Sequence, residues 1–127
     1  MEKNYSINID HIHNLIRYQH TGCIEKEEIG QAWQMFLSKK EFTHQKYNLL
    51  SDYRNSNFNI KVNDLDSICD FLYNIKDILN GKKQALLVDE PLSTALSMLF
   101  CSDVNKRIGF KVKIFSTEDA AFNWLTE

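Results

Sequence analysis

The sequence lacks the features that mark secreted, zinc-ribbon and membrane proteins. Its three cysteines, Cys23, Cys69 and Cys101, are far apart, and their odd number and the absence of a C-x-x-C pair argue against a disulfide framework or a zinc ribbon. No window approaches the roughly 20 apolar residues that span a bilayer, and the first five residues lack the apolar core of a signal peptide. We therefore expect a soluble, cytoplasmic protein without a transmembrane segment.

Charge and motifs also exclude several function classes. The formal net charge is -2 and the basic residues are scattered, so there is no electrostatic footprint for nucleic acid. There is no G-x-S-x-G motif, and Ser93 has no visible histidine and acid partner for nucleophilic catalysis. We expect a protein that is not an enzyme, binds no nucleic acid and needs no cofactor.

Length and composition predict one folded domain over residues 1–127. Hydrophobic residues make up 43% and charged residues 25%, which is near the globular average, so disorder is not expected. A chain of this size buries about two thirds of its unfolded surface, and we find no linker, repeat or low-complexity segment. An ordinary hydrophobic core is therefore sufficient to stabilise it.

The stretch 82–91 organises the predicted fold. Its continuous apolar run, residues 85–88, is bracketed by Gly81 and Pro91 and is typical of a strand inside a parallel sheet with helices on both faces. Pro91 suits the first position of a helix, because its fixed φ is already helical and no hydrogen bond is lost there. The unit places Asp89, Glu90 and Ser93 at the carboxyl end of the strand.

Hydrophobic periodicity predicts the other elements. The expected strands are 5–9, 15–21, 47–53 and 111–115, and the expected helices are 24–39, 63–79, 92–100 and 117–125, with a loop at 54–57. Asn63 is the predicted N-cap of its helix, with Asp66 at N3. The order β-β-α-β-α-β-α-β-α predicts an α/β fold with a single-layer, mainly parallel sheet, helices on both faces and an antiparallel hairpin at one edge. The last strand, with one wet face, should lie at or near the other edge.

Three segments also resemble a known family. They are residues 49–54 (LLSDYR), residues 85–91 (ALLVDEP) with residues 95–100, and residues 112–125 with their alanine pair and Trp124-Leu125. In these segments, and in element order and length, most of the chain resembles the STAS-like group, the fold of anti-sigma-factor antagonists, and in particular the small bacterial STAS/SEC14-related proteins. The resemblance implies a STAS-like domain with a regulatory or protein-interaction role. Its SEC14 side implies binding of a small ligand or lipid head group instead.

The chain departs from the regulatory members of that group at one place. Those antagonists carry a phosphorylatable serine in an Asp-Ser-Ser-Gly-like turn at the head of the helix after the third strand. The corresponding residues 54–63 form a longer stretch without glycine, with Ser56 as the only hydroxyl. A phosphate near a helix amino terminus would be stabilised there, but Ser56 also fits an ordinary loop serine.

Polar residues follow the predicted parallel strands. Open parallel sheets bind ligands outside the carboxyl ends of their strands, where the chain order reverses. Asp52 and Arg54 share a side of an extended chain, where they could meet a polar ligand. The competing interpretation is that such residues cap helices and tie loops together. The candidates are Asp52, Tyr53, Arg54, Asp89, Glu90, Ser93, Ser116 and Thr117.

Two metal-dependent interpretations find little support. A phosphoacceptor receiver domain needs an acidic pair after its first strand and a lysine after its last, but Asp10 stands alone and no lysine follows the last strand directly. His11 and His13, with His20 and Cys23, could supply ligands, but no carboxylate or second cysteine completes a tetrahedral set. We predict no metal site.

The predicted helix 92–100 offers a further surface. Leu92, Ala95, Leu96 and Leu99 suffice for an inward face, which leaves Met98 or Phe100 partly on other sides, among small polar residues. Such a surface suits a protein partner or a homodimer, unless the core simply wraps further round the helix. The sequence therefore predicts a non-enzymatic regulatory or protein-interaction module, or alternatively a small-ligand or lipid-head-group binder using the strand-end loops. The predicted surface consists of Asp52, Tyr53, Arg54, Ser56, Asp89, Glu90, Ser93, Met98 and Phe100.

Overall fold

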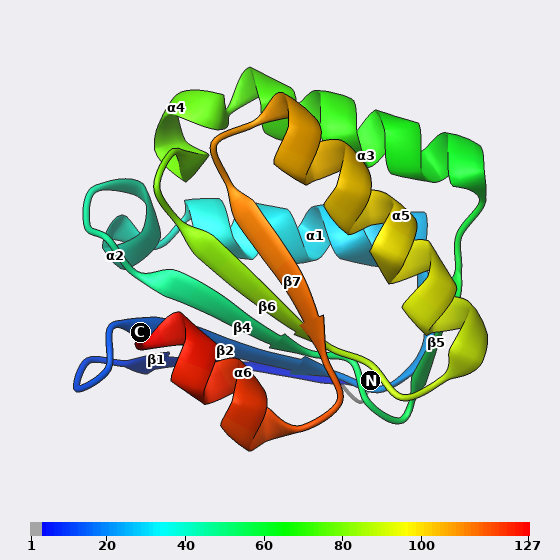
Figure 1. The fold of residues 1–127 in the computed structure, drawn as a ribbon, viewed down its shortest axis with the longest axis horizontal. Coiled ribbons are helices and arrows are strands. Elements are labelled where there is room, and N and C mark those ends of the chain that lie inside the picture. Colours follow the sequence, from blue (N-terminus) through cyan, green and yellow to red (C-terminus); the bar gives the residue numbers. More distant parts are fainter. Residues whose placement is uncertain (1–3) are drawn as a thin grey trace.

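A five-stranded sheet forms the centre of the molecule (Figure 1). The computed structural model describes residues 4–127, and within them the strand order is β1-β2-β4-β6-β7. The bounds are β1 Tyr5–Asp10, β2 Leu15–His20, β4 Asn48–Asp52, β6 Lys83–Leu87 and β7 Lys111–Phe115. β1 pairs antiparallel with β2, and every other pair is parallel. The predicted parallel sheet, its antiparallel edge and the edge position of the last strand are confirmed.

The helices cover the two faces of this sheet unequally. α1 (Lys26–Leu37), α3 (Val62–Asn74) and α5 (Pro91–Arg107) lie in the connections between successive parallel strands, and each connection moves one strand further in the same direction. Since such crossovers are right-handed, all three helices lie on one face. Within the described chain, the opposite face is covered by α6 (Glu118–Leu125) alone (Figure 1). Two short helices, α2 (Lys40–Thr43) and α4 (Lys76–Leu79), complete the connections.

The core is divided in the same way. The larger cluster packs the sheet against the three crossover helices and includes Trp33, Phe36, Leu72 and Val104. The smaller cluster lies under α6 and consists of Leu15, Leu50, Ala85, Leu87, Ala121 and Leu125. Residues 84–87 of β6 are all buried, so the prediction of an interior strand covered on both faces is confirmed.

A second, two-stranded sheet was not predicted. β3 (Gly22–Glu25) pairs in parallel with β5 (Ser56–Asn59), with Ile24 opposite Phe58 and both side chains buried. The predicted helix start at Ile24 is therefore wrong, and the predicted loop at 54–57 is confirmed at 54–55 and wrong at 56–57. β5 follows Asn55 (φ 63°) and β3 begins with Gly22 (φ 91°), and both residues are in the left-handed region. The Gly22 N–H donates to the Asn55 carbonyl at 3.2 Å. β3 and β5 have four residues each, too few for an alternating pattern to identify them. Their stability comes from pairing with each other and from burial, which a local pattern does not show.

Three helix boundaries also differ from the prediction. α3 starts after Lys61, whose backbone N–H donates to the Asp64 carboxylate at 2.9 Å, so the N-cap is not Asn63. The predicted helix 63–79 is broken at Ile75 into α3 and α4. α5 continues past residue 100 to Arg107, because Asn105 near its end bonds to both backbone groups of Val112 in β7, at 3.0 and 3.1 Å.

Gly81 provides a test of the turn between α4 and β6. It has a φ of 83°, and its N–H donates to the Gly109 carbonyl at 2.9 Å. We expect Gly81→Ala to lower the free energy of unfolding by about 1–2 kcal/mol, since a Cβ is disfavoured in the left-handed region. Gly30→Ala, in the open middle of α1, should instead raise that free energy by about 0.5–1 kcal/mol. Urea unfolding of the two variants measures the difference, and equal stabilities would contradict it.

Candidate functional site

The polar residues predicted at the carboxyl ends of β4 and β6 do lie close together. Arg54 donates from Nε and Nη2 to the two carboxylate oxygens of Asp52, at 3.0 and 2.8 Å. This bidentate hydrogen bond raises the pKa of the Arg54 guanidinium. The next residue, Asn55, donates its backbone N–H to Asp89 at 3.1 Å, which joins the loop after β4 to the loop after β6.

Glu90 and Ser93 form the start of α5. Glu90 is the N-cap, and its carboxylate accepts from the backbone N–H groups of Leu92 (3.1 Å) and Ser93 (2.7 Å). These hydrogen bonds, the one from Ser93 foremost, lower the pKa of Glu90. The Ser93 hydroxyl is fully buried, donates to Glu90 at 2.8 Å and accepts from the Phe58 N–H at 3.2 Å. Ser93 therefore connects α5 to β5 and is closed to solvent.

Tyr53 and Ser56 lie inside the molecule. Tyr53 is 5% exposed and packs edge-on against Phe58 and Tyr18, and this burial raises the pKa of its phenol. Ser56 begins β5, is equally buried, and donates its hydroxyl to the Tyr53 carbonyl. Ser56 is thus a strand residue, and its hydroxyl is inaccessible to a kinase while β5 is folded.

The sheet order explains why these polar groups bond to neighbouring loops instead of lining a ligand site. The prediction placed them where the chain order reverses, but successive parallel strands β2, β4, β6 and β7 are added in one direction without a reversal. The connections that leave β2, β4 and β6 all run to the same face, so among the described residues the loops after β4 and β6 do not diverge to form a crevice. Asp52, Arg54, Asp89 and Glu90 instead bond to one another's loops and to helix ends. Thr117 likewise caps α6 by accepting from the Ala120 N–H, whereas Ser116 is exposed.

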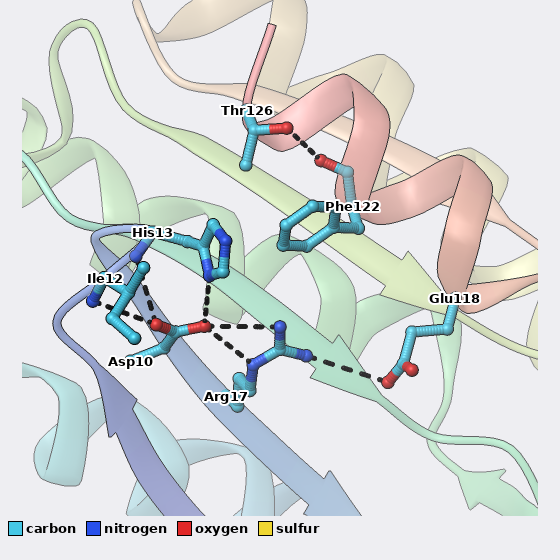
Figure 2. A network of polar contacts seen from close by, with 7 residues as sticks. All are labelled: Asp10, Ile12, His13, Arg17, Glu118, Phe122 and Thr126. Atoms are coloured by element: carbon cyan, nitrogen blue, oxygen red, sulfur yellow. Dashed lines mark hydrogen bonds and ion pairs between the residues drawn. The ribbon is translucent and has the colours of Figure 1, made fainter.

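A second polar network links the β1–β2 turn to α6 (Figure 2). Asp10 accepts from two backbone N–H groups of the turn, from His13 Nδ1 at 2.9 Å, and from Arg17 at 3.3 Å. Arg17 also pairs with Glu118 at 3.7 Å, and the His13 ring packs edge-on against Phe122 with the centroids 4.8 Å apart. The His13 hydrogen bond is the largest cause that lowers the pKa of Asp10 to about 2. The network anchors α6 to the first hairpin.

The histidines considered as metal ligands are held by other groups. His11 Nδ1 is 2.9 Å from the Tyr47 hydroxyl, and buried His20 lies between the Tyr18 hydroxyl (2.8 Å) and Glu28 (3.2 Å). Cys23 is exposed on β3. Within residues 4–127, no group of three histidine, cysteine or acidic side chains is placed to hold a metal ion.

The faces of α5 differ from the prediction. Met98 is 61% exposed, as expected for a surface position, but Phe100 is only 8% exposed and is part of the core, so its predicted surface position is wrong. Leu92 and Leu99, expected inside, are 59% and 50% exposed. The buried face instead consists of Ser93, Leu96, Ser97, Phe100, Cys101 and Val104. Because apolar residues occur all round this helix, periodicity alone could not identify the buried face.

An apolar cavity between the sheet and the crossover helices was missed entirely. It measures about 50 Å³ and contains one buried amide, Gln84 of β6, which is 3% exposed. Gln84 Nε2 donates to the Ser51 hydroxyl at 3.1 Å, whereas Gln84 Oε1 has no hydrogen-bond partner among the described residues. A polar residue in an otherwise apolar interior strand was the available signal. The lining consists of Ile29, Trp33, Tyr53, Phe58, Ile60, Leu65, Ile68, Gln84, Leu86, Leu96, Ser97 and Phe100.

Comparison with known proteins supports the fold. No protein family and no curated protein matches the chain. A solved structure does: an uncharacterised protein of the DUF3478 family with a SpoIIAA-like fold from Shewanella loihica PV-4, at a TM-score of 0.62 and 14% identity over 98% of both chains. Identity this low shows the fold alone, and the STAS-like, SpoIIAA-like fold is confirmed. Among residues 4–127, no helix is long and apolar enough to cross a membrane.

The Asp10 network should contribute an acid-sensitive part of the stability. Because the folded pKa of Asp10 is about 2, against an ordinary value of 3.8, its contribution is complete above about pH 4 and is lost as the pH falls toward 2. We expect Asp10→Asn to lower the melting temperature at pH 6 and to reduce its decline between pH 5 and pH 2. Asp66 is exposed on α3, and its carboxylate makes no hydrogen bond or ion pair within the described chain, so Asp66→Asn is the control. If the melting temperature of Asp10→Asn fell between pH 5 and pH 2 as much as that of the wild-type protein, Asp10 would not be the source of the acid sensitivity.

Proposed function

We propose that this chain is a non-enzymatic interaction module of STAS-like fold, which docks through the outer face of α5 onto a second copy of itself. The observation that supports this most directly is the row of apolar residues on that face. Leu92, Met98 and Leu99 are 50–61% exposed, and Ala95 between them is exposed too. Exposed apolar residues that adjoin one another mark interaction surfaces more often than isolated ones do.

The spacing of this row suits helix pairing. Positions 92, 95 and 99 recur every three to four residues, so their side chains lie along one side of α5. The helix has 17 residues, about 25 Å at 1.5 Å per residue, which is long enough for an extended contact with another helix. The first two thirds of this side are apolar, and Ser102 and Lys106 continue it toward the carboxyl end.

Charge favours a second copy as the occupant. Asp89 and Glu90 lie at the amino end of α5, and Lys106 and Arg107 lie in its last turn. In an antiparallel pair about a two-fold axis, the basic end of each helix meets the acidic end of the other, and Leu92 of one copy approaches Leu99 of the next. Arg107 already pairs with Asp70 at 3.2 Å, whereas Lys106 has no ion pair within residues 4–127. Lys106 is thus the charge available to a partner.

The alternative function, a ligand site in the strand-end loops, is less well supported. Asp52, Arg54 and Asp89, which would contact such a ligand, are already hydrogen-bonded within those loops. Within residues 4–127, by contrast, Leu92, Met98 and Leu99 stay at least 50% exposed. We place the interaction in the cytoplasm, where reducing conditions keep the three unpaired cysteines as thiols.

Sedimentation equilibrium and light scattering over a range of protein concentrations test the proposal. We expect a reversible dimer whose dissociation constant rises about tenfold or more in Leu99→Glu, because a carboxylate would be buried against Leu92 of the other copy. Lys106→Glu should weaken the dimer as well, by losing attraction to the acidic end. Val62→Glu replaces another exposed apolar residue, 58% exposed at the start of α3, and should leave dimerisation unchanged.

Melting temperatures of the three variants will show whether each remains folded. A wild-type protein that stays monomeric at every concentration would refute the proposal. So would a dimer that Leu99→Glu leaves intact while the variant is folded.

A further inference from the structure

The cavity under α5 has a chemical asymmetry. Its walls are mostly aliphatic and aromatic, and they come from both sheets and from α1, α3 and α5. Gln84 introduces one buried amide, whose nitrogen donates to Ser51, a residue outside the lining. The amide oxygen is itself buried beside the cavity, and no described residue donates to it. Buried side-chain acceptors are nearly always hydrogen-bonded in folded proteins, so this oxygen calls for a donor.

The cavity is small, and an open groove lies next to it. About 50 Å³ is a third of the roughly 150 Å³ of an apolar cavity that holds benzene, so only a head group and a few carbons fit inside. An open groove of about 540 Å³ runs between α1 and α3, and Ile29, Trp33 and Ile68 line both spaces. Phe71 extends its apolar wall, and Lys26, Gln31 and Gln34 lie at its polar margin. The cavity and the groove therefore adjoin at these three side chains.

We propose that the cavity and this groove bind a slender aliphatic molecule that ends in one hydrogen-bond donor, of the primary alcohol class. The hydroxyl donates to Gln84 Oε1, and the alkyl chain lies between α1 and α3. An ionised fatty acid does not fit, because a carboxylate has no proton to donate and would bring an unpaired charge into an apolar cavity. The site uses the inner face of α5 and is separate from the outer face proposed for dimerisation.

Two small probes of equal size test the donor requirement. Hexanol and pentyl methyl ether have the same number of heavy atoms, but only hexanol can donate a hydrogen bond. Titration is followed in ¹H–¹⁵N spectra of the full chain through the Gln84 side-chain amide and the Trp33 indole. The Trp124 indole, on α6 across the sheet, is the internal control. We expect hexanol to shift the Gln84 and Trp33 signals, to leave Trp124 unchanged and to raise the melting temperature with concentration. The ether should bind about tenfold more weakly, by the loss of one hydrogen bond.

A double variant removes the acceptor without leaving a new unpaired group. Ser51→Ala with Gln84→Leu replaces both bonded partners by apolar groups, which preserves folding better than either change alone. In this variant we expect hexanol and the ether to bind with the same affinity. Equal binding of the two probes to the wild-type protein would overturn the proposal, as would a preference for hexanol that survives in the double variant. Unchanged Gln84 and Trp33 signals with both probes would show that the cavity holds water only, and would overturn it too.

Discussion

The handedness of the strand connections determines most of this structure. From β2 to β7 each parallel strand is added on the same side of the previous one, and right-handed crossovers then place α1, α3 and α5 on a single face. Three helices share that face, whereas the opposite face of the described chain has α6. The unequal layers follow from the topology, and so do the large core with its cavity on one side and the small core on the other.

The same topology explains the structural role of the strand-end residues. Without a reversal in strand order, the loops after β4 and β6 run side by side over the sheet edge and face each other rather than a crevice. Asp89 therefore meets the backbone of Asn55, and Arg54 folds back on Asp52. Buried Ser93 extends this set of contacts to β5. The result is a hydrogen-bonded cover over the carboxyl ends of the strands, and apolar surface is left to α5 and to the groove between α1 and α3.

Sequence reasoning was reliable where one strong local signal decided the outcome. Pro91 identified the start of α5, and the apolar run before it identified an interior strand, so the α/β order and the STAS-like fold could be predicted. The buried face of α5 could not be predicted, because Ser93 and Ser97 point inward, where their small size lets the helix approach its neighbours. Leu92, Met98 and Leu99 remain on the outside. The β3–β5 pair depends on contacts between residues more than thirty positions apart. The cavity depends on how α1, α3, α5, β5 and β6 pack together, which no local pattern contains.

The division of the core has a consequence for how the molecule opens. α6 has eight residues, and its own Ala121 and Leu125 pack on four buried side chains of the sheet, Leu15, Leu50, Ala85 and Leu87. Outside that cluster, α6 is tied to the first hairpin by the Arg17–Glu118 ion pair and the His13–Phe122 contact. Its detachment would expose one face of β4 and β6 while the larger core stays packed, so α6 should behave as a separate unit of local unfolding. Amide protons of α6 would then exchange with solvent at a lower free energy than those of α1, α3 and α5. The sheet would thus have a kinetically labile face and a stable one.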